Sequence, residues 1–141
     1  MSSMFYGCTS LTTLEDLKDW NVSSVTTMIS MFKGCTGLTK LDISGWSVNT
    51  KVKTGSMFNG CGELVTTWAS SDKPDFSGVT SSASMFTGCE KLKGGDGSTI
   101  KTVQALDSTN YLKATYAKIG TGSADASTAG YFTDVSKKTT G

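Results

Sequence analysis

The residues of this chain whose type and spacing could do chemistry are four cysteines. They are Cys8, Cys35, Cys61 and Cys89, and each closes a Met-Phe-x-Gly-Cys motif. Thiols can pair as disulfides, bind metal ions or act as nucleophiles. The chain has no histidine and no Cys-x-x-Cys spacing, so the cysteines are poorly suited to a zinc site. We therefore predict that the chain binds no metal ion.

Catalytic chemistry is also poorly supported. The lack of histidine removes the commonest general base and every Ser-His or Cys-His arrangement. Aspartates occur in two close pairs, but nothing in the sequence places either pair across a cleft, and turn or capping roles explain them. These pairs are Asp16 with Asp19 and Asp72 with Asp75. We predict a protein that is not an enzyme and that uses no cofactor.

The composition narrows the class of partner and the location. The 141 residues include 20 Ser, 22 Thr and 16 Gly, while 18% are charged, so hydroxyl groups must cover much of the surface. This is more typical of extracellular repeat or β-rich proteins than of a charged cytosolic enzyme. A net charge of +1 with no arginine argues against nucleic-acid binding. We expect an extracellular or cell-surface location, with the export signal outside this chain and no direct membrane insertion.

The motifs recur at a near-constant period. They begin at Met4, Met31, Met57 and Met85, at spacings of 27, 26 and 28 residues. Self-similarity in this range is typical of proteins that stack one small structural unit. Equivalent cysteines in such a stack would lie about 4.8 Å apart with parallel Cβ vectors, outside the usual disulfide range of ~3.5–4.5 Å. We favour buried free thiols over disulfides, and stacked Met and Phe side chains in the core.

Residues 22–48 give the clearest single unit. Apolar side chains at Val25, Met28, Met31, Phe32 and Cys35 would share one face of a short helix or of helical turns. The following residues 38–44 read Leu-x-x-Leu-x-Ile, which predicts a short strand. We therefore predict an α/β repeat, a leucine-rich-repeat solenoid of about four short strand-plus-helical-turn units with an irregular C-terminal cap.

The repeat pattern also suggests a division of the chain. We predict a solenoid over residues 1–92 that begins in mid-repeat, a capping segment over residues 93–133, and a tail or linker over residues 134–141. In the cap, seven apolar side chains are expected to face inward. These are Ile100, Val103, Leu106, Tyr111, Leu112, Tyr116 and Ile119.

Several of these stretches resemble a known family. The stretch VTTMISMFKGCTGLTKLDISGW, the repeated MF-x-GC and the ending LKGGDGSTI…ATYAKIG…GYFT are similar to the BspA-like leucine-rich-repeat surface proteins of bacteria. The resemblance covers nearly the whole chain. It implies an exported or surface-attached protein associated with adhesion to host matrix proteins or other cells, or with microbial surface structures. The family is functionally diverse, so the resemblance indicates the fold better than the ligand.

Two functions remain open from the sequence. The first is a non-enzymatic adhesion or protein-binding module that contacts a host matrix or cell-surface protein through its strand face. Its candidate contact residues are Thr13, Glu15, Lys40, Asp42 and Thr66. The alternative is a structural or assembly subunit of a surface filament, which binds further copies of itself through its N-terminal end. The candidate residues for that contact are Met4, Phe5, Leu11 and Leu14.

Overall fold

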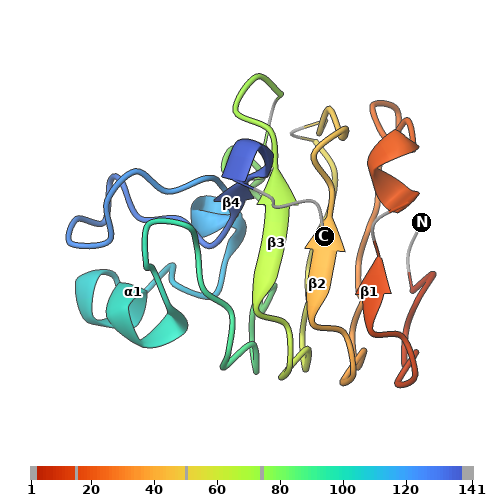
Figure 1. Cartoon of the computed structure of the whole chain (residues 1–141), viewed down its shortest axis with the longest axis horizontal. Helices are drawn as coiled ribbons and strands as arrows, with labels where there is room; N and C mark the ends of the chain where they lie inside the picture. Colours follow the sequence, from red (N-terminus) through yellow and green to blue (C-terminus); the bar gives the residue numbers. More distant parts are fainter. Residues whose placement is uncertain (1–2, 15, 50, 74, 138–141) are drawn as a thin grey trace.

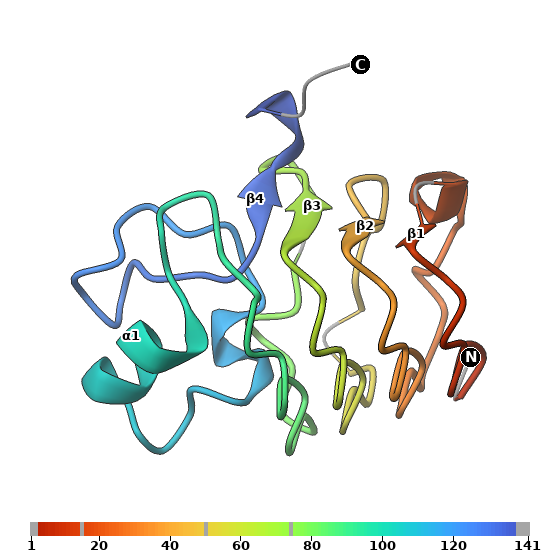
Figure 2. The same cartoon turned by 60° about the horizontal axis from the view of Figure 1, so that its bottom comes forward.

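The computed structural model describes residues 3–14, 16–49, 51–73 and 75–137. Four short parallel strands lie side by side in one sheet, in chain order β1-β2-β3-β4 (Figure 1). Their bounds are Thr13–Leu14 for β1, Lys40–Asp42 for β2, Thr66–Ala69 for β3 and Thr133–Asp134 for β4. We call residues 3–27, 28–53, 54–81 and 82–92 coils 1 to 4, and residues 93–137 the capping segment. The coils stack beside one another, and the capping segment follows coil 4 (Figure 2).

The predicted leucine-rich-repeat solenoid with helical turns is wrong. Within the described ranges, the one α-helix is α1, Ile100–Leu106, and it belongs to the capping segment rather than to a coil. Three short 3₁₀ helices complete the helical content. They are η1, Asp16–Asp19, η2, Ala114–Tyr116, and η3, Val135–Lys137. The Met-Phe half of each coil is a series of tight turns.

Backbone geometry explains why these segments are not helical. In coil 2, Ser30 and Gly34 have φ angles of 58° and 76°, which lie in the left-handed region and interrupt a right-handed helix. The amide of Phe32 donates to the carbonyl of Met57 in coil 3, at 2.9 Å, instead of to a carbonyl four residues earlier. A run of tight turns can therefore place inward-facing side chains at sequence spacings close to those of a helix.

The four phenylalanines of the motifs form one stack through the coils. The rings of Phe5, Phe32, Phe58 and Phe86 lie 5.4, 5.4 and 5.5 Å apart, with interplanar angles of 0°, 6° and 8°. The motif methionines of coils 2 to 4 are fully buried beside them. The predicted Phe stack is confirmed, and Met28, Met31 and Met57 are buried in the core. It supplies the continuous core that no single coil could form alone.

The capping segment ends the stack with rings at a different angle. Tyr131 and Phe132 meet the Phe86 ring edge-on, with centroids at 5.0 and 6.4 Å and interplanar angles of 69° and 72°. The Thr99 side chain caps the start of α1 by accepting a hydrogen bond from the amide of Thr102. Strand β4 pairs with β3, so the capping segment completes the same sheet.

Most of the predicted inward-facing residues of the cap contact the core. Val103 and Tyr116 are buried, and four others pack against the core while partly exposed. These four are Ile100, Tyr111, Leu112 and Ile119. Leu106 is 39% exposed, so its prediction is wrong, because the short helix α1 buries Val103 and ends at Leu106. The predicted domain boundaries remain predictions. The described residues include no helix that is both long enough and apolar enough to cross a membrane.

Candidate functional site

The outer face of the sheet carries a row of polar side chains. Thr13, Lys40 and Thr66 are direct register partners across β1, β2 and β3. Thr13 and Lys40 are exposed and Thr66 is half-buried, whereas Leu14 and Leu41, one position further along their strands, contact the core. Strand register thus brings three of the predicted contact residues together.

The other two residues predicted for this face, Glu15 and Asp42, are not found exposed on it. Asp42 lies two positions after Lys40, but it is 1% exposed, so the prediction of an exposed carboxylate is wrong. It accepts a hydrogen bond from the amide of Ser44 at 2.9 Å, and its register partner Trp68 is itself buried. A buried carboxylate that holds the chain after β2 is a structural group rather than a contact for a partner. Glu15 lies outside the described residues.

The N-terminal end of the stack is the second predicted contact surface. Met4 is 53% exposed, whereas Phe5, Leu11 and Leu14 are half-buried and pack against the core. Tyr6, which no sequence pattern singled out, is 57% exposed, and its ring centroid lies 5.9 Å from the amino group of Lys33. The four predicted residues therefore occupy coil 1, where the end of the stack is only partly covered.

The cysteines form a ladder of hydrogen bonds and not of disulfides. All four are free thiols, as predicted. The Cys35 thiol donates to the Phe5 carbonyl at 3.0 Å, and the thiols of Cys61 and Cys89 repeat this contact with the Phe carbonyl of the preceding coil. Burial raises the pKa of Cys35, raises that of Cys61 to about 12 and raises that of Cys89 further. Raised pKa values make these thiols poor nucleophiles, so they are structural groups.

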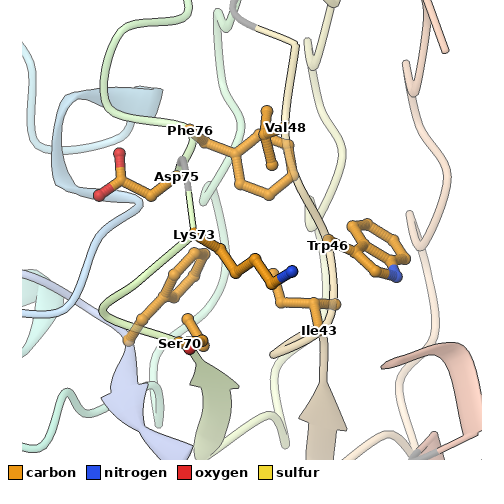
Figure 3. A pocket seen from close by; sticks show the side chains of 9 residues that line it. Ile43, Trp46, Val48, Ser70, Lys73, Asp75 and Phe76 are labelled. Carbon is orange, nitrogen blue, oxygen red and sulfur yellow. The ribbon is translucent and has the colours of Figure 1, made fainter. Parts of the chain in front are cut away.

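A small hollow lies where β2 and β3 end and the loop of residues 70–76 begins (Figure 3). Ile43, Trp46 and Phe76 give it an apolar lining, and Lys73 extends across it while the Asp75 carboxylate points the other way. The space has room for no more than about one water molecule. It is therefore too small to hold a substrate.

Comparison with known proteins identifies the family. Residues 1–100 match the family described as Mycoplasma protein of unknown function, DUF285. This chain belongs to that family. None of the curated proteins and none of the solved structures compared with the chain matches it. The matched range of this DUF285 protein includes β1 to β3, all four motifs and both predicted contact surfaces.

A second, wider hollow of the DUF285 protein lies beside β4. Asp96, Asp134 and Lys137 line it together with Thr121. The Asp96 carboxylate accepts hydrogen bonds from the amides of Ser98 and Gly122, and that of Asp134 accepts one from the amide of Ser136. Both carboxylates are thus engaged by nearby backbone. Within the described residues, no three His, Cys, Asp or Glu side chains gather closely enough to hold a metal ion.

Proposed function

We propose that this DUF285 protein is a non-enzymatic protein-binding module that acts at the cell surface or outside the cell. Its contact surface is the outer strand face formed by Thr13, Lys40 and Thr66. The observation that supports this proposal is the alignment of these side chains by strand register on an exposed face. A protein partner can use such a broad surface without a deep pocket.

Other features favour the same class of function. Hydroxyl side chains and glycine are abundant, and Val65, which directly precedes β3, is 41% exposed. One exposed apolar side chain beside a polar row is compatible with a protein interface, where apolar contacts are surrounded by polar ones. The sequence similarity to BspA-like surface proteins supports a partner among host matrix or cell-surface proteins. It also supports export from the cell.

The test is binding of the full chain to immobilised collagen, laminin and fibronectin. The variant Lys40→Glu reverses the charge at the centre of the row, and Lys51→Glu makes the same change on an exposed side chain in the loop after β2. We expect Lys40→Glu to weaken binding by about tenfold and Lys51→Glu to leave it unchanged. Equal losses in both variants, or no binding to any of the three proteins, would overturn the proposal.

A second function, assembly through the N-terminal end, has one observation in its favour. Phe5 is half-buried at the end of the phenylalanine stack, and Met4 beside it is exposed. Exposed apolar groups at the end of a stack of repeats favour association with another chain. Sedimentation of the unmodified chain and of Phe5→Lys tests this: a concentration-dependent increase in mass should occur in the first and be lost in the second.

A further inference from the structure

The backbone hydrogen bonds between the motif segments of neighbouring coils all run in one direction. The amide of Phe5 donates to the carbonyl of Met31 at 2.8 Å, and Phe32 and Phe58 donate to the equivalent methionines of the next coils at 2.9 Å. The amide of each motif glycine, two residues after the phenylalanine, also donates to the next coil: the amide of Gly7 donates to the carbonyl of Lys33 at 2.8 Å. The backbone amides of each motif therefore donate to the coil after it, and the carbonyls that accept such bonds face the coil before it, whereas the cysteine thiols donate in the opposite direction.

In coil 1, the carbonyls that would accept hydrogen bonds from a preceding coil have no donor among the described residues. By the spacing of the motifs, the carbonyls of Met4 and Tyr6 correspond to those of Met31 and Lys33 in coil 2. No residue that the structure describes donates a hydrogen bond to either carbonyl. The two acceptors are two residues apart, which matches the spacing of the Phe and Gly amides of a motif.

Among the residues that the structure describes, the side chains of Cys8 and Phe5 also lack, on the N-terminal side of coil 1, the contacts that their equivalents make in later coils. The thiols of coils 2 to 4 donate to the Phe carbonyl of the preceding coil, but the half-buried Cys8 thiol contacts no such carbonyl within the described ranges. The Phe5 ring has a parallel partner in Phe32, and its other aromatic contact described is Trp20, 6.2 Å away and tilted by 31°. Coil 1 thus presents two carbonyls, one thiol and one ring face.

We infer that this end is a binding surface for one further coil of the same Ser-Met-Phe-x-Gly-Cys type, which docks by its C-terminal side. Such a coil supplies two amide donors two residues apart, a Phe carbonyl for the Cys8 thiol, and a ring for stacking on Phe5. This inference rests on the second proposed function, assembly through the N-terminal end, and names the chemistry of the partner.

Other occupants fit the surface less well. Two copies joined by their N-terminal ends would place acceptors against acceptors, so the backbone hydrogen bonds could not form. A second copy cannot offer the C-terminal side of its coil 4, because its capping segment lies there and the carbonyl of Leu112 accepts from the amide of Phe86. An extended strand would not follow the bend of coil 1, where Ser3 and Gly7 have φ angles of 57° and 72°.

The test joins a copy of residues 28–53 to the full chain ahead of residue 1. This length keeps the register, because Met1, Met28 and Thr54 each stand three residues before a motif methionine in the sequence. The measurement is the rate at which iodoacetamide alkylates Cys8 in the native protein. We expect the added coil to slow this rate by about tenfold or more, because the thiol becomes buried and hydrogen-bonded.

A matched control carries Phe32→Lys and Gly34→Val in the added copy alone. These changes remove the stacking ring and the left-handed glycine, so Cys8 should react as fast as it does in the unextended chain. Protection of Cys35, Cys61 and Cys89 in every variant shows that the original coils remain folded. Equal Cys8 rates with the intact and the altered copy would overturn the inference.

Sedimentation distinguishes a failure of this inference from a failure of the proposed assembly through the N-terminal end. If the unmodified chain associates, Phe5→Lys abolishes the association, and the added coil leaves Cys8 reactive, then assembly stands and the partner is a different one. If association of unmodified copies protects Cys8 by itself, the partner is a second copy and the inference is overturned. If neither association nor protection occurs, both the assembly function and the inference fail.

Discussion

The two ends of the phenylalanine stack differ in geometry. Phe86, in coil 4, is fully buried, and two rings of the capping segment meet it edge-on. Phe5, in coil 1, is half-buried and has a parallel ring on one side. Perpendicular rings end the stack, because their edges offer no face aligned for a further parallel ring. The comparison shows that the stack ends where the ring orientation changes from parallel to perpendicular. It can be extended where the last ring still offers a face to a parallel ring.

The largest expected effect comes from removing the same ring at the middle and at the end of the stack. Phe32→Ala should lower the free energy of unfolding by about 3–5 kcal/mol, because the side chain is fully buried between two rings. Phe5→Ala should lower it by about 1–2 kcal/mol, since its side chain is already half-exposed. Urea unfolding followed by circular dichroism measures both. Equal losses would mean that the two ends are covered to the same degree.

An intermediate effect should follow from alkaline pH, which acts on the buried thiol ladder. The pKa of Cys61 is raised by burial to about 12, so folding favours the neutral thiol. This stability is complete below pH 9, the ordinary pKa of a thiol, and is lost as the pH rises toward 12, by about 1.4 kcal/mol per unit.

The control for the pH effect is Cys61→Ala, which removes one of the buried thiols whose pKa is raised. Its free energy of unfolding should fall less steeply between pH 9 and 11 than that of the unmodified chain. Tyr116 also has its pKa raised to about 12, by burial and by its hydrogen bond to Asp107, so some alkaline loss remains in the capping segment. Identical slopes for the two proteins in urea titrations would contradict a role for the thiol ladder.

The smallest expected effect is on the strand face. Lys40→Ala removes an exposed side chain whose contribution to the core is negligible, so the free energy of unfolding should change by less than about 0.5 kcal/mol. The same urea experiment measures it. A loss comparable to that of Phe32→Ala would show that this face is part of the folded core and not a surface for a partner.

Repeated features were predictable from the sequence because each appears several times in the same surroundings. Four Phe and four Cys at equivalent positions predicted the ring stack and the free thiols, and the structure has both. The row of Thr13, Lys40 and Thr66 follows from the repeat period, which places equivalent strands in register.

The errors came from interactions that the repeat does not encode. The spacing of Met28, Met31 and Phe32 is compatible with a helix, but the amides bond to the next coil, and local periodicity does not contain that information. Alternation places Asp42 on the same face as Lys40, but it does not say what covers that face, so the burial of Asp42 was not predictable from it. The hollow beside Trp46 is lined by residues from coil 2, coil 3 and the capping segment, so a single unit could not reveal it.

The one-way backbone hydrogen bonding between motifs bears on how such a chain can change over generations. Each internal boundary repeats the same backbone bonds, thiol contact and ring separation. A duplication or deletion of 26 to 28 codons that respects the motif spacing would therefore join surfaces that already fit, without new compensating substitutions. We expect that genes for such proteins can gain or lose whole coils by recombination between their own repeats, with one capping segment serving every resulting length.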